Sequence, residues 1–375
     1  MAKLGDIATY INGYAFKPQD WSDEGIPIIR IQDLTGNSYQ ANRYNGEYAS
    51  KYEVNDGDVL ISWSASLGVY IWHGEKAVLN QHIFKVVFDK ERISKDFFVH
   101  QVGLILENAA SDAHGATMKH LTKPVFDALP FYLPPYEKQC EIAEVLDKVT
   151  SLISLRKQQL AKLDELVKAR FVEMFGEPVQ NPNCWKKENL LDLGYCKNGM
   201  NFHRDDCGTE IHCLGVGDFK NHSTIRDVGS LPFISLNELP TSEYLLQDGD
   251  IVFVRSNGNK ELVGRCLAIY PAKIPVTYSG FCIRYRLTSN KITVSYLLRV
   301  LKADSVRKKM TGRGANIQNL NQQILAQLVV PIPPLSLQNQ FAAFVERVDQ
   351  QKQTVQQSLE KLELMKKALM QEYFG

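Results

Sequence analysis

The sequence predicts an α+β protein in which two mixed α/β domains are joined by two long antiparallel coiled-coil helices. Three observations predict this fold. One helical stretch occurs twice at a constant offset, the segments before each copy share short motifs, and strand-like and helix-like patterns mix in both of those segments. Because internal repeats of this length rarely arise by chance, we expect a pseudo-two-fold repeat in the order domain, helix, domain, helix.

The repeated stretch covers residues 133–176 and 332–375, which align without a gap. Pro134-Pro135 aligns with Pro333-Pro334, and Gln139 aligns with Gln338. Further identical pairs are Ala143 and Ala342, Val149 and Val348, Leu160 and Leu359, Leu163 and Leu362, Lys168 and Lys367, and Phe175 and Phe374. Proline at the start and glycine at the end are typical of a helix, so each copy predicts one helix.

Apolar residues recur every seven positions in both copies, which predicts a coiled-coil seam. The main rows are Leu146, Ile153, Leu160, Val167 and Met174 in the first copy, and Phe341, Val348, Val355, Leu362 and Leu369 in the second. A helix of about 40 residues is roughly 60 Å long, which predicts a spacer. The seams must pair antiparallel, because a parallel pairing needs a return loop of helix length that the sequence lacks.

Four basic residues interrupt the seam: Arg156, Arg170, Lys352 and Lys366. Their aliphatic stems can cover apolar surface while the charged groups reach water. Alternatively, these side chains face helices of a partner protein. Both interpretations stay open from the sequence.

Composition is ordinary for a globular protein, with 43 Lys and Arg against 42 Asp and Glu. No apolar run is long enough to span a bilayer, and the first residues lack the apolar core of a signal peptide, so we expect a cytoplasmic protein. The seven cysteines form no C-x-x-C pair, which favours free thiols over a zinc site. Residues 1–133 carry a net charge of −4 and residues 177–332 a net charge of +5.

The predicted boundaries are 1–133 for the first domain, 134–176 for the central helix, 177–332 for the second domain and 333–375 for the C-terminal helix. Strands are expected at 28–31, 59–61 and 82–88, and a helix at 96–106. The motif Gly57-Asp58 has its counterpart in Gly249-Asp250, and Asn12-Gly13 has its counterpart in Asn198-Gly199. The domain frames are therefore related while their interiors differ.

Catalytic motifs are scarce. The sequence has neither a phosphate-binding G-x-x-x-x-G-K-[ST] loop nor an H-E-x-x-H metal motif. Leu133-Pro134-Pro135-Tyr136 resembles the Asn/Asp-Pro-Pro-Tyr loop of adenine methyltransferases, but Leu133 cannot hydrogen-bond the amine that is methylated. Asp58 and Asp250 precede strands, where Gly-Asp is ordinary turn chemistry. We therefore expect no catalytic residues and no metal ligands on this chain.

Polar and aromatic residues crowd the loops of both domains. Arg, Asn and Gln are the side chains that read guanine and adenine edges in the major groove, so these loops are candidate DNA-binding sites. The first domain offers Arg30, Gln32, Ser62, Trp63, Ser64, Asn80, Gln81, His82, Lys119 and His120. The second offers Arg255, Ser256, Asn257, Asn259, Lys260, Arg307, Lys308, Lys309, Arg313 and Asn316. Any single one is more simply a solvated loop residue. The set, however, predicts two DNA-reading surfaces that recognise different short base sequences, or words.

This organisation resembles the specificity subunit of type I restriction–modification systems over essentially the whole chain. The residues that carry the resemblance are the paired Pro-Pro-x-x-x-Gln helix starts, the Gly-Asp strand starts, and Gly115 and Gly314 ahead of Leu121 and Leu320. The family more often has Glu-Gln where this chain has Lys138-Gln139 and Leu337-Gln338.

The resemblance implies a non-catalytic subunit with two target-recognition domains that read a bipartite target in double-stranded DNA. The helices would set the spacing between the half-sites, with an upper limit near 18 base pairs, and would dock methyltransferase subunits. S-adenosylmethionine is expected on those subunits, and ATP and Mg²⁺ on restriction subunits, with no cofactor on this chain. The acidic first domain then shares phosphate binding with its partners.

The candidate partner-binding positions are apolar residues outside the two-helix seam: Leu152, Leu166, Phe344 and Met365. The alternative for such stripes is packing within the chain. Three other functions also stay open. They are a fused methyltransferase or nuclease, a coiled-coil adaptor that binds only protein, and a subunit of a related DNA methyltransferase system outside type I.

Overall fold

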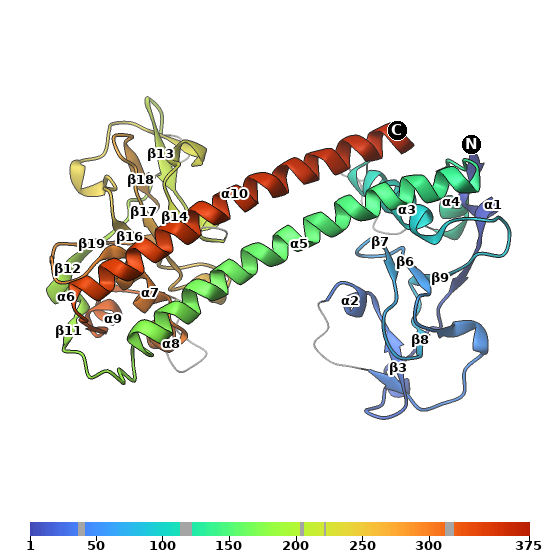
Figure 1. Cartoon of the computed structure of the whole chain (residues 1–375), viewed down its shortest axis with the longest axis horizontal. Coiled ribbons are helices and arrows are strands. Elements are labelled where there is room, and N and C mark those ends of the chain that lie inside the picture. Colours follow the sequence, from blue (N-terminus) through green and yellow to red (C-terminus); the bar gives the residue numbers. More distant parts are fainter. Residues whose placement is uncertain (37–41, 113–121, 203–205, 221–222, 312–318) are drawn as a thin grey trace. The chain divides into compact units, whose positions relative to one another are not determined.

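The computed structural model describes residues 1–36, 42–112, 122–202, 206–220, 223–311 and 319–375. It divides into two compact units. The first unit comprises Met1–Gln158 and Gln356–Gly375, and the second comprises Gln159–Val355. The predicted coexistence of helices and sheets in two related halves is confirmed, and the long helices α5 (Tyr136–Phe175) and α10 (Leu335–Phe374) run as expected (Figure 1).

The first unit contains two four-stranded sheets and one two-stranded sheet within its described residues, in the orders β2-β9-β6-β7, β4-β3-β8-β5 and β1-β10. Its strands are β1 (Ala2–Lys3), β2 (Thr9–Asn12), β3 (Ile26–Ile29), β4 (Arg43–Tyr44), β5 (Glu53–Val54), β6 (Val59–Ser62), β7 (Gly68–Ile71), β8 (Ala77–Leu79), β9 (Ile83–Val87) and β10 (Pro130–Phe131). Its helices besides α5 and α10 are α1 (Leu4–Ile7), α2 (Ile31–Leu34), α3 (Lys95–Asp112) and α4 (Lys123–Asp127), with 3₁₀ turns η1 (Pro18–Asp20) and η2 (Ser50–Tyr52).

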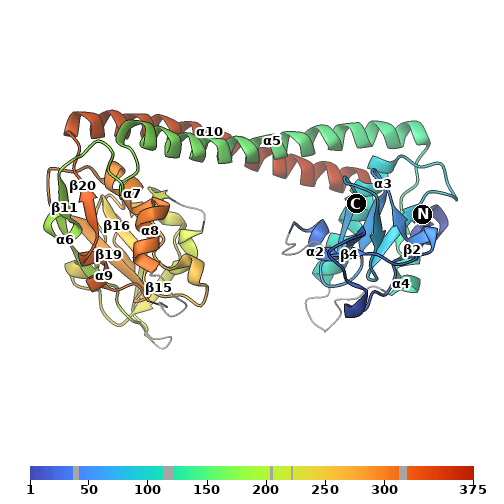
Figure 2. The same ribbon diagram turned by 90° about the horizontal axis from the view of Figure 1, so that it is seen from below.

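The second unit repeats this plan with a five-stranded sheet β12-β19-β16-β17-β14, a three-stranded sheet β15-β13-β18 and the pair β11-β20. Its strands are β11 (Lys187–Asn189), β12 (Gly194–Asn198), β13 (Thr209–Leu214), β14 (Thr224–Ile225), β15 (Phe233–Leu236), β16 (Asp250–Val254), β17 (Cys266–Ile269), β18 (Val276–Tyr278), β19 (Cys282–Leu287) and β20 (Val329–Pro331). Its helices are α6 (Leu190–Leu193), α7 (Val294–Lys302), α8 (Asp304–Thr311) and α9 (Gln322–Ala326), which are labelled in Figure 2. Its 3₁₀ turns are η3 (Val216–Phe219), η4 (Val228–Ser230), η5 (Ser242–Tyr244) and η6 (Lys260–Leu262).

One strand prediction extends too far. The predicted strand at 28–31 ends at Ile29, and Ile31 opens the short helix α2. The cause is local, because the Asp33 carboxylate accepts a hydrogen bond from the Arg30 backbone N–H at 2.8 Å. An acidic side chain three residues ahead that holds this N–H favours a helical turn over continued strand.

The two helices pair antiparallel in each unit, as the seam predicts. In the first unit the beginning of α5 packs with the end of α10, where Lys157 Nζ lies 2.9 Å from Glu363 Oε1. In the second unit the end of α5 packs with the beginning of α10, where Val167 and Phe341 share one core and Lys352 pairs with Asp164. The Lys352 side chain is mostly covered, and its amine is directed at the neighbouring helix of the same chain.

The repeated glutamine is a buried clamp at the start of each long helix. Gln139 Oε1 accepts from the Ser94 N–H at 2.9 Å, and its amide donates to the Pro134 carbonyl at 2.9 Å. Gln338 Oε1 accepts likewise from the Thr293 N–H at 2.8 Å. Each glutamine thus ties the first turn of a long helix to the residue that starts the domain helix α3 or α7. A buried amide that satisfies backbone groups in this way fixes the angle between the two helices.

Candidate nucleic-acid interface

Candidate reading residues of the first unit converge at one end of the strands, where β2 and β6 end and β9 begins. This end of the strands is called the reading edge, or the edge, below. The Trp63 backbone N–H, just after β6, donates to the His82 carbonyl, just before β9, at 3.2 Å. The Trp63 indole donates to Asn12 Oδ1 at 3.2 Å, and its ring centroid lies 5.0 Å from that of His82. Gln81 donates its N–H to the Tyr14 carbonyl at 2.8 Å. Residues distant in sequence are therefore brought together where four strands begin or end.

Strands β3 and β8 run parallel and reach the same edge. The Asn80 N–H, after β8, donates to the Ile29 carbonyl at 3.1 Å, which places Arg30 beside it in the fold. The Arg30 guanidinium is largely covered, with its Cζ 5.5 Å from the Trp21 ring centroid and its Nε 3.8 Å from Asp33. Gln32 lies on α2 and is partly exposed. The edge therefore gathers Trp63, Asn80, Gln81 and His82, with Arg30 next to it in the chain after Ile29.

The second unit builds the same edge from different side chains. The Arg255 N–H donates to the Phe281 carbonyl at 2.8 Å, as Trp63 does to His82. Arg255 therefore occupies the position of Trp63, and Phe281 that of His82. Ser256 forms an isolated bridge with Asn319, and the Leu320 N–H donates to the Arg255 carbonyl at 2.7 Å.

A glycine makes each edge possible. A Cβ on Gly13 would lie 2.1 Å from the Asn80 carbonyl oxygen, and a Cβ on Gly199 would lie 2.0 Å from that of Ser279. Only glycine permits this close backbone approach. The shared Asn-Gly motif in the sequence is thus explained by packing at the candidate interface.

Two predicted readers are wrong, because their side chains are buried. Ser62 is fully buried and donates its hydroxyl to the Ser66 carbonyl, and Ser64 is also buried. Both point into the fold and support the loop that carries Trp63. The alternation of a strand explains the error, since successive side chains of Ser62-Trp63-Ser64 face opposite sides.

The remaining candidates of the second unit lie on the loop after β16 and on α8. Asn257 Oδ1 accepts from the Asn259 N–H at 2.8 Å, and Asn259 Oδ1 accepts from the Glu261 N–H at 3.0 Å, so both amides shape the loop. Lys260 opens η6, and its side chain lies outside the described residues. Arg307 donates to the Glu261 carbonyl, which joins α8 to this loop. Lys308 and Lys309 are exposed on α8, whereas Lys119, His120, Arg313 and Asn316 lie outside the described residues.

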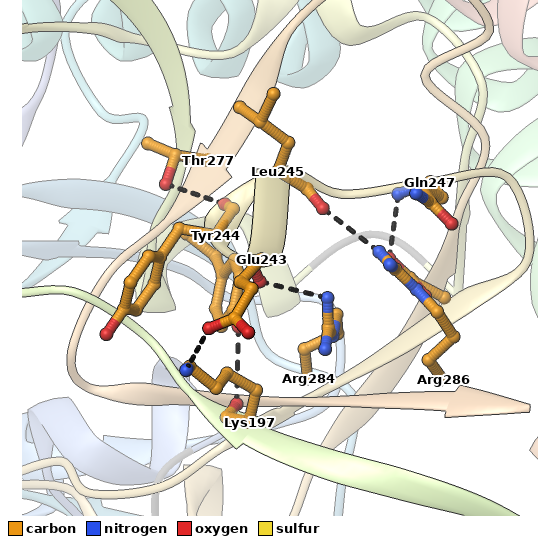
Figure 3. Close-up of polar contacts among 10 residues, drawn as sticks. Lys197, Glu243, Tyr244, Leu245, Gln247, Thr277, Arg284 and Arg286 are labelled. Atoms are coloured by element: carbon orange, nitrogen blue, oxygen red, sulfur yellow. Dashed lines mark hydrogen bonds and ion pairs between the residues drawn. The ribbon is translucent and has the colours of Figure 1, made fainter. Parts of the chain in front are cut away.

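Arg284, Arg286, Asp250 and Thr277 form a network of hydrogen bonds, the polar clip, which connects strands of the second unit to the 3₁₀ turn η5 and the residues after it. The sequence alone did not indicate it. In Figure 3, Arg284 donates to the Glu243 carbonyl at 3.1 Å, and Arg286 donates to the Leu245 carbonyl at 3.0 Å. Arg286 also binds both oxygens of the buried Asp250, at 2.8 and 2.7 Å, and this pairing raises the pKa of Arg286. The Thr277 hydroxyl donates to the Tyr244 carbonyl at 3.0 Å.

The first unit contains a simpler version of this clip. Lys85 Nζ donates to the Glu53 carbonyl at 2.7 Å and lies 2.9 Å from Asp58. The sequence signal is the pattern Ser-x-Tyr-x-x-x-x-Gly-Asp, which occurs at 50–58 and again at 242–250. The clip holds the 3₁₀ turns η2 and η5 on their sheets, so it is part of the shared frame and does not vary like the readers.

Three of the predicted partner-binding positions are exposed. Leu152 is 44% exposed and Met365 is 49% exposed in the first unit, and Leu166 is 46% exposed in the second. Phe344 is the exception, because it is half-buried and packs against the core of the second unit. A heptad pattern cannot show that the domain itself covers one side of α10, which is why Phe344 was misjudged.

A groove of about 590 Å³ lies at the C-terminal part of α5 within the second unit. Its lining combines apolar and charged side chains from the end of α5, the following segment and α7–α8, among them Phe171, Val172, Val179 and Lys302. Burial lowers the pKa of Lys302 to about 8. The groove therefore offers apolar surface with a largely covered amine at its wall.

The described residues contain no group of three or more His, Cys, Asp or Glu side chains that is placed to hold a metal ion. All seven cysteines lie in the described part of the chain and are free. No described helix combines the length and the apolarity needed to cross a membrane.

Comparison with known proteins agrees with these features. The family model for the type I restriction modification DNA specificity domain matches residues 1–165 and 210–364. The type I restriction enzyme MjaVIII specificity subunit of Methanocaldococcus jannaschii is 23% identical, over 99% of this chain and 90% of its own length. The StySPI specificity subunit of Salmonella potsdam is 24% identical, over 93% of this chain and 81% of its own length. The crystal structure of a type I S subunit from M. genitalium shares the fold, with a TM-score of 0.57 at 13% identity, covering 100% of this chain and 95% of that one. The chain belongs to the family of type I restriction–modification DNA specificity subunits.

Proposed function

We propose that each unit reads one half of a bipartite DNA target through its sheet edge, and that the chain has no catalysis of its own. The observation that carries the proposal is the equivalence of the two edges. Both are built on equivalent strands and an equivalent glycine contact. Trp63 and His82 in the first unit are replaced by Arg255 and Phe281 in the second. A constant frame with exchanged side chains is what two readers of different words require.

The catalytic functions are proposed to belong to partner subunits. Methyltransferase subunits would bind S-adenosylmethionine and methylate adenine, and restriction subunits would use ATP and Mg²⁺. The absence of methyltransferase sequence motifs and the position of Leu133 ahead of α5 support this division. The basic α8, with Lys308 and Lys309, would contribute phosphate contacts in the second unit.

The assignment can be tested by co-expressing the chain with the methyltransferase subunit encoded beside it and mapping methylated adenines. We expect one split word with adenine methylation in both parts. Methylation without sequence preference, or methyl transfer by the highly purified chain alone, would contradict the proposal. Tight association with the partner but no sequence-specific DNA protection would instead favour the adaptor function.

Replacing Arg255 and Asn257 with alanine is expected to alter only the word read by the second unit. Each lost base contact should reduce discrimination by about 1–3 kcal/mol at one position. Methylation mapping measures this, with Lys273→Ala as the matched control. Lys273 is exposed in the turn between β17 and β18, at the opposite end of the strands from the edge, so both words should persist in that variant. A changed first word in the double variant would contradict independent reading.

Replacing Leu166 and Met365 with glutamate is expected to weaken binding of the methyltransferase subunit. A charge placed in an apolar contact loses the burial of the leucine or methionine, worth about 1.5–3 kcal/mol each, and adds a desolvation penalty. Titration calorimetry with the purified subunit measures the loss. Ala161→Glu supplies the control, because Ala161 is exposed on α5 but is turned away from Leu166 around the helix. Equal affinity of the folded double variant and the control would reject these docking positions.

A further inference from the structure

Phe281 is a large apolar side chain left in solvent at the edge of the second unit, where it is 61% exposed. Its counterpart in the first unit, His82, lies against the Trp63 ring with the centroids 5.0 Å apart. At the Trp63 position the second unit has Arg255, whose guanidinium donates to the Gly280 carbonyl at 3.4 Å. Because folding buries little of Phe281, its phenyl ring contributes little to the stability of the unit.

The backbone around Phe281 is nevertheless firmly held. The Phe281 carbonyl accepts from the Arg255 N–H at 2.8 Å and from the Ser256 N–H at 3.4 Å. The Phe281 N–H lies 3.3 Å from Ser279 Oγ, which accepts its hydrogen bond. A Cβ on Gly280 would lie 2.0 Å from Asn201 Oδ1, so a second loop packs tightly behind the turn. A backbone held in this way loses little entropy when the side chain that it carries binds a ligand.

The residues that hold the Phe281 backbone are polar, and two of them, Arg255 and Ser256, are candidate readers. Arg255 and Ser256 bond directly to its carbonyl, and Ser279 bonds to its N–H. On the major-groove edges of DNA bases, polar atoms dominate, and the thymine 5-methyl group is the apolar one. A rigid phenyl ring placed among hydrogen-bonding readers is therefore complementary to that methyl group.

We propose that Phe281 is a specificity residue that contacts the 5-methyl group of a thymine in the half-site of the second unit. This inference rests on the proposed function, because it needs the edge to face DNA. It adds an apolar component to readout that the sequence analysis, with its emphasis on Arg, Asn and Gln, did not assign. Trp63 and His82 pack against each other in the first unit, so this apolar contact is specific to the second word.

The test replaces each thymine of the mapped second half-site by deoxyuridine, one at a time, and measures binding by the assembled methyltransferase complex. Deoxyuridine pairs like thymine and lacks only the methyl group. We expect one position at which wild-type affinity falls about three- to fivefold, the effect of exposing one methyl group. Phe281→Ala should bind the unmodified site more weakly and should show no further loss at that position.

Two variants keep the result interpretable. Phe281→Leu retains an apolar side chain and should keep part of the deoxyuridine effect. Ile274→Ala removes an exposed apolar side chain from the turn between β17 and β18 and should leave the effect unchanged. The proposal is overturned if wild type tolerates every deoxyuridine, if Phe281→Ala remains as sensitive as wild type, or if the second word contains no thymine. Failure of the proposed function looks different, because no split word would be mapped at all.

Discussion

Inserting seven residues between Gln158 and Gln159, and seven between Val355 and Gln356, is expected to lengthen the gap between half-sites by about three base pairs. Both sites lie where each long helix passes from one compact unit into the other. One heptad preserves the seam and adds roughly 10 Å at 1.5 Å per residue, which equals about three base pairs at 3.4 Å. Both words should stay intact, because the insertions lie within the long helices α5 and α10 and leave the loops that read DNA unchanged.

Rotation decides whether one heptad shifts recognition or abolishes it. Three base pairs turn a duplex by about 100°, at about 10.5 base pairs per turn, whereas one heptad turns the helix pair much less. Three heptads add about 31 Å, near nine base pairs, and bring the half-sites close to the same face again. We therefore expect activity to return for three heptads with a gap about nine base pairs longer. Methylation mapping across the series measures this, and an unchanged target with an unchanged gap would show that the helices do not set the spacing.

Asp250→Ala is expected to destabilise the second unit by about 3–5 kcal/mol, because it leaves the Arg286 guanidinium partly buried without its partner. The lost carboxylate accepts from Arg286 at 2.8 and 2.7 Å and from the Gln247 N–H at 2.7 Å. For a unit of this size the unfolding midpoint should fall by about 6–20 °C. Thermal unfolding followed by circular dichroism measures the shift.

Glu243→Gln is the matched control for Asp250. Glu243 lies 2.6 Å from Lys197 in the same clip, but it is exposed, and water screens such pairs so that they contribute little to stability. Lys197 lowers the pKa of Glu243 through their hydrogen bond, so the control changes a charged group as Asp250→Ala does. Equal midpoints for the two variants would contradict the structural role of the buried pair.

The repeat in the sequence predicted the architecture because it records two physical constraints that act locally. Proline, the heptad rows and the terminal glycine define a helix without reference to the rest of the chain, and α5 and α10 begin and end within two residues of the expected positions. In the sequence, Gln139 and Gln338 can be recognised only as identical residues at equivalent positions of the repeat. Each side chain bonds the residue directly before α3 or α7, Ser94 or Thr293. Tertiary contacts of that kind leave no periodic signal in the sequence.

The candidate interface was predictable as a set of loops and not as individual contacts. Trp63, Asn80, Gln81 and His82 come together because β6 and β9 are neighbours in one sheet, and β8 of the second sheet leads directly into β9 through residues 80–82. The prediction failed for Ser62 and Ser64 because the segment continues the alternation of β6, which turns these two side chains into the fold. Phe281 was missed for the opposite reason, since an apolar residue ahead of a strand is expected to be core until its exposure is measured.

The first unit is built from two segments that are far apart in the sequence, which affects when it can finish folding during synthesis. Its core contains Met370 from α10, with Leu369, Tyr373 and Phe374 packed against it, so this unit is completed by residues synthesised well after its first segment. At about 5–20 residues per second, roughly 200 intervening residues delay completion by about 10–40 s. During that interval Ile142, Ala143 and Leu146 on the nascent α5 lack part of their cover. A chaperone or an early-bound partner subunit that shields this stretch would therefore raise the yield of active protein without touching either reading edge.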